Sequence, residues 1–499
     1  MNRTTSRPEI LLRIERRPGA ILRVQFEREL RDAIRGGRLL PGTPLPSSRV
    51  LAADLGLSRG VVVEAYEQLL AEGYLTARRG SATRVAARES PVEPGAPIEQ
   101  APPPMRYDFR PGVPDGEMFP RRAWLTSLRR VLTSVAGAAF GYPDPSGVLP
   151  LRQSLSAYLN RVRGTAARPD RVVLCTGFAQ GLRLVCQALR ARGVTRVVVE
   201  DPSHALHRAT MQAAGLTVVP VPVDRGGLRV DRVRTIDAGA VMVTPAHQFP
   251  TGAVLGPDRR AALLDWAVAR GAVVIEDDYD AEYRYDREPI GALQGLAPDR
   301  IAYAGSVSKT LAPALRLGWL VLPADLVTTV ASLKRQEDMG SPALDQLAYA
   351  DFLERGELDR HLRRTRRHYR RRRDLLVATL RRHAPGLRVH GVAAGLHLFV
   401  ELAPTADEGR VRSAAAERSV AVYGVRAHRA RHAGPPALLL GYGNLSNAAI
   451  VEGVKRLASV LTETGAHVSS SPSARVAKSA AVGGRKSRSP ASHSAFENG

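Results

Sequence analysis

The sequence predicts an α/β protein whose body follows a separate helical region. Short β-branched runs alternate with longer helical patterns through residues 107–465, which is typical of an α/β body. Most of these runs are continuously apolar, as expected for a parallel sheet covered by helices on both faces. The length of 499 residues also exceeds that of one ordinary domain. We therefore expect a large, mostly parallel sheet behind a distinct N-terminal domain.

Composition divides the chain into five regions, because helical patterning, proline content and apolar content change along it. They are an N-terminal leader (1–15), a helical domain (16–85), a Pro-rich linker (86–106), the α/β body (107–465) and a basic tail (466–499). The tail has almost no large apolar residues, so we expect it to be disordered. Within the body, the candidate strands are 171–175, 196–200, 217–221, 240–244, 272–276, 300–304 and 317–322.

Cysteine content and hydropathy indicate the cellular compartment in which the protein is expected. The only cysteines, Cys175 and Cys186, lie in apolar stretches, which argues against disulfides and against a zinc site. The N-terminus lacks the apolar core of a secretory signal, and no apolar run is long enough for a membrane span. We expect a cytoplasmic protein without a bound metal. Its formal net charge of +24 fits a nucleic-acid partner, although an arginine-rich composition alone also produces it.

The helical domain contains a predicted helix-turn-helix. Apolar residues at every fourth position, from Leu22 to Ile34, indicate one helix before the GGRLLPG break. Ser47 or Ser48 can cap a second helix, Gly56 permits a turn, and Ser58 starts a third. The inward-facing residues of this third helix are expected to be Val62, Ala65, Tyr66 and Leu69. Residues 76–85 fit a two-stranded wing with Gly80-Ser81 at its tip.

Residues 45–75 resemble the GntR-type winged helix, whose pattern LPSSRxLAxxLGxSRxxVxxAYxxLxxxGYL they follow nearly without interruption. The resemblance implies binding to double-stranded DNA through the third helix and the wing. Helix starts also offer N–H groups and hydroxyls to phosphates. The expected DNA-binding residues are Ser47, Ser48, Arg49, Ser58, Arg59, Gly60, Arg79, Gly80 and Ser81. The alternative is that the arginines are ordinary solvated surface residues.

A lysine within SVSKTLAPALRLGW (306–319) is the sharpest chemical feature of the body. Lys309 lies between small hydroxyl residues after a predicted strand, and Arg316 follows with a guanidinium suited to a phosphate. Such a lysine acts chemically when an electrophilic carbonyl is present, and pyridoxal phosphate supplies one.

Three other motifs follow predicted strands: VVIEDDYDAEYRY (273–285), TPAHQFPTG (244–252) and TGFAQGL (176–182). Aspartates at a strand end can pair with a protonated pyridine nitrogen, or they can bind a metal. No His/Glu cluster or phosphate-loop lysine accompanies them, so the metal alternative is the weaker one. Carboxyl ends of strands are where open α/β sheets gather ligands.

These segments, with GYPDPSGVLPLRQSLSAYL (141–159), resemble a fold-type I aminotransferase, and with the winged helix they resemble the MocR subfamily of GntR regulators. The resemblance implies a smaller α+β domain beside the large sheet, pyridoxal 5′-phosphate as cofactor and a head-to-tail homodimer. It makes Lys309 the Schiff-base lysine, Asp277 the partner of the pyridine nitrogen and Tyr279 the partner of the ring hydroxyl. The residues expected around the phosphate are Phe178, Ala179, Ser306, Ser308 and Arg316, with Gln180 nearby.

The chain departs from the aminotransferase pattern at three positions. Phe249 replaces the asparagine that contacts the cofactor ring, and His247 or Gln248 can substitute for it. His204 replaces the aromatic residue that stacks on the ring. Leu439 occupies the position of the arginine that grips the substrate carboxylate.

The leucine at position 439, where aminotransferases have an arginine, favours a ligand-sensing role of the body over an enzymatic one. A buried carboxylate without a bidentate partner is costly to desolvate, so an amino acid should bind poorly unless another arginine reaches it. The available candidates are Arg121, Arg122, Arg426 and Arg429. Within the family the chain resembles PdxR-type regulators, which respond to the cofactor and control its synthesis. The alternatives are a regulator whose effector is an amino acid or amine, and an active aminotransferase. Any transaminase activity should be weak.

Nine arginines in residues 359–374 predict a long basic helix, which we interpret as a solvated or dimer-facing surface rather than a DNA contact.

Overall fold

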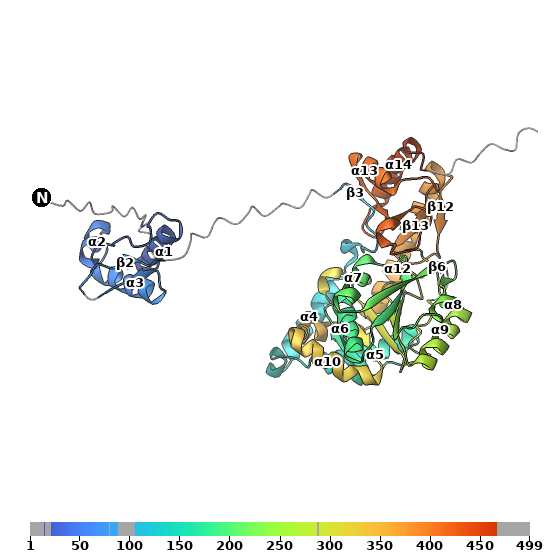
Figure 1. Cartoon of the computed structure of the whole chain (residues 1–499), viewed down its shortest axis with the longest axis horizontal. Helices are drawn as coiled ribbons and strands as arrows, with labels where there is room; N and C mark the ends of the chain where they lie inside the picture. Colours follow the sequence, from blue (N-terminus) through green and yellow to red (C-terminus); the bar gives the residue numbers. More distant parts are fainter. Residues whose placement is uncertain (1–13, 15–20, 79, 88–104, 287–288, 467–499) are drawn as a thin grey trace, which may run out of the picture. The chain divides into compact units, whose positions relative to one another are not determined.

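The computed structural model describes residues 14, 21–78, 80–87, 105–286 and 289–466. The chain forms two compact units, residues 1–102 and 103–499, called here the head and the body (Figure 1). Most of the predicted leader, linker and tail, and Arg79 of the wing, lie outside the described residues. Within the described ranges, no helix has the length and hydropathy to cross a membrane.

The head has the winged-helix fold that the sequence predicts. Its elements are α1 (Leu22–Arg35), α2 (Ser48–Leu55), α3 (Arg59–Ala71), β1 (Leu75–Thr76) and β2 (Arg84–Val85). Ser47 caps α2 by accepting the Val50 N–H, and Ser58 caps α3 by accepting the Val61 N–H, both at 3.4 Å. Gly56 ends α2 with a φ of 62°, a left-handed conformation that suits glycine.

The head core forms where the apolar stripes of its helices meet. Phe26 and Leu30 of α1 are fully buried against α3. All four residues expected to face inward from α3 are buried: Val62, Ala65, Tyr66 and Leu69. The two wing strands pair antiparallel, Leu75 with Val85 and Thr76 with Arg84.

The body contains one eight-stranded sheet, in the order β4-β11-β10-β9-β8-β5-β6-β7. Its strands are β4 (Val172–Cys175), β5 (Arg196–Asp201), β6 (Thr217–Asp224), β7 (Gly227–Leu228), β8 (Ala240–Val243), β9 (Val273–Asp277), β10 (Ile301–Ser306) and β11 (Gly318–Val321). Every candidate strand overlaps one of them. The sheet is mostly parallel, but β11 runs antiparallel between β4 and β10, and β7 is antiparallel to β6.

Helices cover both faces of this sheet, which explains its continuously apolar strands. In β5, Val197 and Val199 pack in one core with α6 (Phe178–Ala191), α7 (Ala205–Ala213) and α10 (Ala324–Asp338). Val198 faces the opposite core, with α8 (Val230–Val233) and α9 (Pro257–Arg270). Figure 1 shows α6, α7, α8 and α9 around the sheet. This sheet with its helices is called the large lobe.

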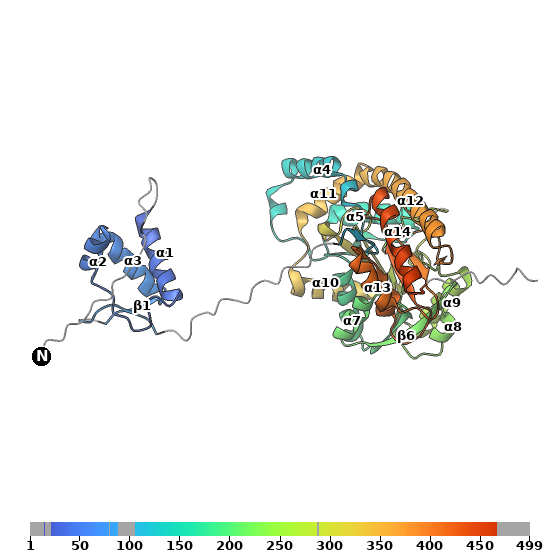
Figure 2. The same ribbon diagram turned by 90° about the horizontal axis from the view of Figure 1, so that it is seen from above.

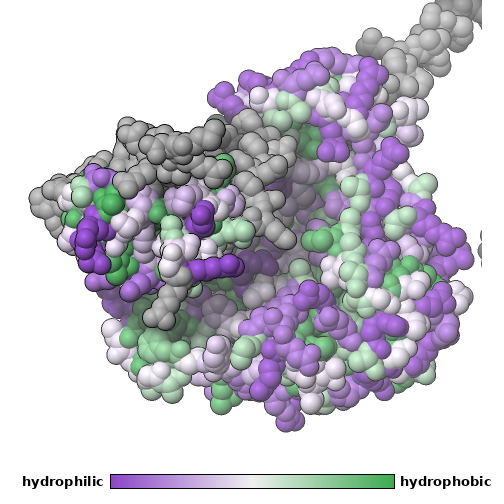
Figure 3. Space-filling model, turned by 60° about the vertical axis from the view of Figure 1, so that its left-hand side comes forward, coloured by the Kyte–Doolittle hydropathy of each residue, from purple (hydrophilic) through white to green (hydrophobic). Residues whose placement is uncertain are grey.

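Further helices share one hydrophobic core with Val172 and Leu174 of β4 and complete the body. They are α4 (Arg121–Ser134), α5 (Leu149–Arg163), α11 (Ala343–Glu354) and α12 (Glu357–His383). Helix α11 packs against both α4 and α5. The predicted arginine-rich segment lies in α12, which runs beside α14 (Figure 2). On the face shown in Figure 3, hydrophilic residues dominate and apolar residues are scattered among them.

A small lobe of α+β type carries the C-terminal part of the described chain. Its four-stranded antiparallel sheet has the order β12-β13-β16-β15. The elements are β12 (Arg388–His390), β13 (His397–Glu401), α13 (Glu408–Glu417), β14 (Val420–Ala421), β15 (Tyr423–Gly424), β16 (Ala437–Gly441) and α14 (Asn447–Glu463). The first strand of the body, β3 (Tyr107–Asp108), pairs in parallel with β14.

Candidate cofactor site and DNA-binding face

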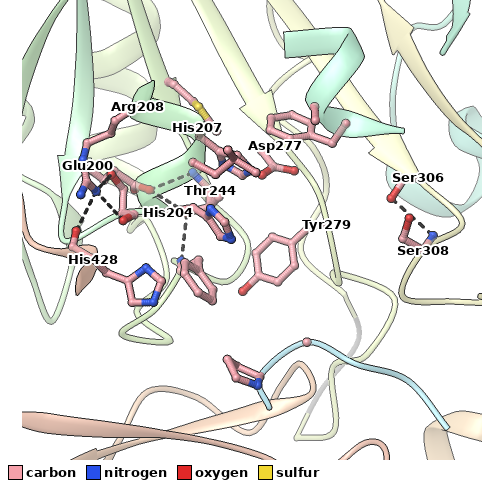
Figure 4. A pocket seen from close by; sticks show the side chains of 18 of the residues that line it. Glu200, His204, His207, Arg208, Thr244, Asp277, Tyr279, Ser306, Ser308 and His428 are labelled. Carbon is pink, nitrogen blue, oxygen red and sulfur yellow. Dashed lines mark hydrogen bonds between the residues drawn. The ribbon is translucent and has the colours of Figure 1, made fainter. Parts of the chain in front are cut away.

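A cavity of about 540 Å³ lies at the carboxyl ends of β5, β8, β9 and β10, and the small lobe contributes to its wall. Figure 4 shows its side chains. Nine of the predicted site residues line it: Phe178, Ala179, His204, Asp277, Tyr279, Ser306, Ser308, Lys309 and Arg316. Segments far apart in the sequence therefore meet at one sheet edge, as the position of their motifs predicted.

Lys309 enters the cavity beside Gly112. A Cβ on Gly112 would lie 3.2 Å from the Lys309 Nζ, and Gly112 has a φ of +70°. Glycine thus leaves room for the amino group as well as permitting this backbone conformation. Burial lowers the pKa of Lys309 from its usual 10.5, although Asp280 and Asp277 oppose the shift. A larger fraction of the amine is therefore neutral, the form that attacks a carbonyl.

Asp277 ends β9 and lines the cavity, and its carboxylate oxygens accept no hydrogen bond from a described residue. Burial raises its pKa well above 3.8, with further increases from Asp278 and Asp280 and an opposing effect from Lys309. Its neighbour Asp278 turns away and pairs with the buried Arg163 at 2.7 Å. A cationic partner in the cavity, such as a protonated ring nitrogen, would stabilise the charged form of Asp277.

One end of the cavity has the donors that a phosphate needs. Helix α6 begins at Phe178, so its free N–H groups face this end, and Gly177 precedes it with a φ of 108°. Arg316 lines the cavity, makes no ion pair with a described residue and adopts a left-handed φ of 47°. The Ser306 and Ser308 hydroxyls lie nearby, with the Ser308 N–H donated to Ser306 Oγ. An unpaired guanidinium, hydroxyls and a helix N-terminus fit a phosphate group.

Tyr279 joins the cavity to a buried polar chain. Its hydroxyl lies 3.0 Å from His247 Nδ1, which also lies 3.0 Å from Asp280 Oδ2. Burial, followed by Asp280 and Asp277, raises the pKa of Tyr279 well above 10.0. The phenol therefore stays protonated and can donate a hydrogen bond.

His204 presents an imidazole to the cavity. Its ring stacks on His207, with centroids 4.4 Å apart and planes 21° apart. Burial lowers the pKa of His204, and Lys309 and Arg208 lower it further. A neutral ring suits the stacking role that the sequence predicts for this position.

Three predicted cofactor residues do not line the cavity. Gln180 accepts from the Thr176 N–H and donates to Glu337 and Asp338, so it ties α6 to α10. His247 lies behind Tyr279. Gln248 braces the turn after β8, donating to the Pro202 carbonyl at 2.9 Å and accepting from the Thr251 N–H. In this structure these three residues hold neighbouring groups in place and do not form part of the cavity surface.

An apolar wall occupies the place where the sequence lacks the expected arginine. Leu439 of β16 is fully buried and belongs to a cluster with Phe399, Val425 and Ala437. Phe249 and Tyr423, which line the cavity, pack against this cluster. The four substitute arginines considered from sequence, Arg121, Arg122, Arg426 and Arg429, are not among the residues lining the cavity.

The sequence did not single out several lining residues. From the large lobe come Glu200, His207 and Arg208; from the small lobe come His397, Tyr423 and His428; and Arg110 and Gly112 follow β3. Glu200 accepts from the Thr244 hydroxyl at 2.6 Å, and burial raises its pKa to about 7. No shared local motif marked these residues, because they lie in strands, helices and loops of both lobes. Among the described residues, no three His, Cys, Asp or Glu side chains gather to hold a metal ion.

On the head, the predicted DNA-contacting residues lie around α2, α3 and the wing. Ser47, Ser48 and Ser81 line a cavity of about 330 Å³ between them. Arg49, Arg59, Gly60 and Gly80 are exposed, and neither arginine forms an ion pair with a described residue. Exposed, unpaired arginines at helix starts are available to phosphates or base edges.

The fold and cavity define a winged-helix DNA-binding protein fused to an aminotransferase-like body. Residues 22–85 match the bacterial regulatory proteins of the gntR family, and residues 112–457 match aminotransferase class I and II. The chain is 32% identical to the uncharacterized HTH-type transcriptional regulator YhdI of Bacillus subtilis, over 87% of this chain and 93% of that protein. It is 35% identical to the HTH-type pyridoxine biosynthesis transcriptional regulator PdxR of Corynebacterium glutamicum, over 75% and 82%.

A third relative is the probable rhizopine catabolism regulatory protein MocR of Rhizobium meliloti, 32% identical over 87% of this chain and 92% of that protein. The chain belongs to the MocR subfamily of GntR-type transcriptional regulators.

Solved aminotransferases share the fold of the body. Kynurenine aminotransferase of Pyrococcus horikoshii, in complex with PMP, matches with a TM-score of 0.66 and 25% identity, over 72% of this chain and 91% of that chain. The α-aminoadipate aminotransferase LysN of Thermus thermophilus, complexed with N-(5′-phosphopyridoxyl)-L-leucine, matches with a TM-score of 0.66 and 26% identity, over 72% and 92%. These neighbours use pyridoxal-type cofactors, and the donors around Lys309 suit such a group.

Proposed function

We propose that the chain is a cytoplasmic regulator that binds double-stranded DNA through the head, holds pyridoxal 5′-phosphate at Lys309 and takes this cofactor as its signal. The observation that carries the proposal is the combination of unpaired partners in one cavity: the Asp277 carboxylate, the Arg316 guanidinium and the Lys309 amine. Each matches one part of the cofactor, namely the ring nitrogen, the phosphate and the aldehyde. When bound, the cofactor supplies an electron-withdrawing ring and a reactive aldehyde.

The residues of the cavity each have a proposed role. Arg316, Ser306, Ser308 and the start of α6 hold the phosphate, Tyr279 donates to the ring hydroxyl, and His204 stacks on the ring. The apolar wall at Leu439 and Phe249 withholds the usual grip on an amino-acid carboxylate, which supports a sensor rather than an aminotransferase. One relative is named for pyridoxine biosynthesis, which supports a target operon in vitamin B6 synthesis.

We further propose a head-to-tail homodimer. Large apolar side chains are exposed on and after α4: Leu125, Leu132, Phe140, Tyr142 and Leu149. Exposed apolar groups concentrated in neighbouring elements are typical of a surface that another chain covers. Sedimentation of the purified protein tests this assembly, and a monomer at micromolar concentration would contradict it.

The test of the signal is the affinity for the DNA upstream of the chain's own gene, with and without pyridoxal 5′-phosphate. In the wild type we expect the cofactor to change the affinity about 5- to 150-fold, the usual range of coupling between two sites. Lys309→Ala should remove most of this change while leaving the affinity without cofactor intact. Equal affinities in all four measurements would overturn the proposal.

A further inference from the structure

The arginines of α12 form an inward and an outward group. Two face the body: the Arg366 Nε donates to the Glu282 carbonyl at 3.0 Å, and Arg372 pairs with Asp115 at 2.9 Å. On the outward side, every exposed residue of α12 from position 360 to position 371 is an arginine. These are Arg360, Arg363, Arg364, Arg367, Arg370 and Arg371, called here the arginine face. Figure 2 shows α12 at the periphery of the body.

The arginine face follows the period of the helix. Residues that are three, four, seven or eleven positions apart share one side of an α-helix, and the members of the face are spaced in this way. Like charges at this spacing repel one another and destabilise a helix when nothing neutralises them. No acidic residue occurs in the sequence between Asp359 and Asp374, so α12 supplies little compensation of its own along this stretch.

The charges of the arginine face are only partly neutralised by neighbouring residues. Arg360 pairs with Glu357 at 2.6 Å, and Arg370 lies 3.9 Å from Asp374. Three members form no ion pair with a described residue: Arg363, Arg367 and Arg371. A solvated row of this kind carries its repulsion without compensation, whereas a polyanion bound along the row removes it.

The arginine face continues into an open cleft of about 630 Å³ between the starts of α4 and α12. The basic residues that line this cleft are Arg121, Arg122, Arg360 and Arg364, and the acidic ones are Glu117 and Glu357. Arg122 is exposed and forms no ion pair with a described residue. Arg364 donates to the Met118 carbonyl at 3.0 Å, which leaves its charge without an acidic partner. Positive charge therefore extends from α12 to the start of α4.

A contact between two copies of this surface is the weaker interpretation. The sequence alone favours a solvated or dimer-facing surface, because it does not separate the inward arginines from the outward ones. In the structure, the exposed apolar residues that we assign to the dimer lie on and after α4. On α12 no exposed residue from 360 to 371 is apolar. Two copies that met through this face would bring identical positive charges together.

We propose that the arginine face binds the phosphate backbone of double-stranded DNA beyond the segment that the head holds. From Arg363 to Arg371 the row spans about 12 Å of helix, which matches about three phosphates at ~3.4 Å of DNA axis per strand. The planar guanidinium suits a phosphate, because it can donate two parallel N–H groups. Head and body belong to one chain, so DNA held by the head stays near the body. The inference rests on the proposed function, in which the head recognises the sequence.

The test uses the full chain, a long duplex from upstream of its own gene and an unrelated duplex of the same length. The Gln variant combines Arg363→Gln, Arg367→Gln and Arg371→Gln. Each phosphate contact contributes about 0.9 to the slope of log K against log salt, so we expect this slope to fall by about 2–3. Affinity should fall by the same factor for both duplexes, because phosphate contacts carry no sequence information. A loss confined to one duplex would contradict a backbone contact.

Two further variants separate this contact from overall charge and from folding. The control removes the same charge from exposed arginines of the sheet edge and α8 region, with the substitutions Arg196→Gln, Arg225→Gln and Arg234→Gln. It should keep the wild-type slope. The Lys variant carries Arg363→Lys, Arg367→Lys and Arg371→Lys, and it should keep most of the slope because its charge is unchanged.

Three outcomes would overturn the inference: a wild-type slope in the Gln variant, an equal loss in the control, or an equal loss in the Lys variant. A wild-type slope in the Gln variant would leave the arginine face to an acidic protein partner instead. If the wild-type chain binds neither duplex, the proposed function fails, and this result is distinct from the other three.

Discussion

Asp201 at the end of β5 and His432 in the small lobe are joined by a hydrogen bond, with 2.9 Å between Asp201 Oδ2 and His432 Nδ1. The same carboxylate accepts the backbone N–H groups of Ala430, Arg431 and His432. Next to this contact, the His428 carbonyl accepts from the Ser203 N–H and from Arg208. Residues 428–432 are therefore fastened to the large lobe at the rim of the cavity.

This fastening should weaken when Asp201 loses its charge. Burial works against ionisation, but the three backbone N–H groups and His432 hold the pKa of Asp201 below 3.8. A carboxyl group with a lowered pKa in the folded state adds stability above its unfolded pKa, and this stability is lost as the pH falls through the folded value. Asp201→Asn should therefore lower the free energy of unfolding by about 1–3 kcal/mol at pH 7.

The Asp201→Asn effect should shrink below about pH 4, where the unfolded carboxyl group is protonated. Chemical denaturation of the wild type and of Asp201→Asn at pH 7 and at pH 3.5 measures the loss of stability at each pH. Faster amide exchange at residues 428–432 should accompany the loss of stability at pH 7. An unchanged exchange rate there would contradict the fastening.

Gly112→Ala should impair attachment of the cofactor. The added Cβ would lie 3.2 Å from the Lys309 Nζ, closer than an ordinary contact. We expect at least a tenfold weaker affinity for pyridoxal 5′-phosphate, measured from visible absorbance. Gly465→Ala is the matched control, because Gly465 also has a positive φ, of +63°, but a Cβ there meets nothing within 4 Å. If both variants bind the cofactor equally, the crowding at Lys309 is unimportant.

The rate of cofactor attachment should depend on pH with a midpoint below the usual lysine value. Burial lowers the pKa of Lys309 from 10.5, and only the neutral amine attacks an aldehyde. The rate should rise with pH through this lowered pKa and level off above it. Stopped-flow absorbance measures the profile, with butylamine as the unperturbed reference. A midpoint equal to that of butylamine would mean that Lys309 reacts as a solvated side chain.

Arg59→Ala should reduce DNA affinity and its dependence on salt. Arg59 is the exposed first residue of α3, where a phosphate contact would contribute about 0.9 to the slope of log K against log salt. The slope should fall by about that amount in Arg59→Ala. Arg28→Ala removes the same charge from the exposed surface of α1 and serves as the control. Equal slopes in the two variants would point to overall charge rather than contact.

Much of the fold could be predicted from short stretches of sequence, because both domains contain strong periodic patterns of apolar residues. The winged helix follows from capping serines and an apolar stripe, and the sheet follows from apolar runs of strand length. The antiparallel direction of β11 could not be predicted, because an apolar run does not indicate in which direction its strand pairs with the neighbouring strands. It becomes visible only through its register with β4 and β10.

The residues of the cavity likewise fall into those that the sequence predicted and those that it did not. Lys309, Asp277 and Arg316 were identified because each belongs to a dense local motif. His207, His397 and His428 were missed because the cavity assembles them from separate segments of both lobes. Gln180 shows the opposite problem: it stands next to cavity residues in sequence, but its side chain points toward α10.

The pairing of β3 with β14 fixes the first described strand of the body to the small lobe. Tyr107, the first strand residue after the linker, is hydrogen-bonded to the small lobe through the Ser419 carbonyl, and Gly112 reaches Lys309 only five residues later. A rotation of the small lobe would therefore carry the first described strand of the body with it. The segment 107–112 is a covalent link of six residues between the small-lobe pairing and the wall of the cavity.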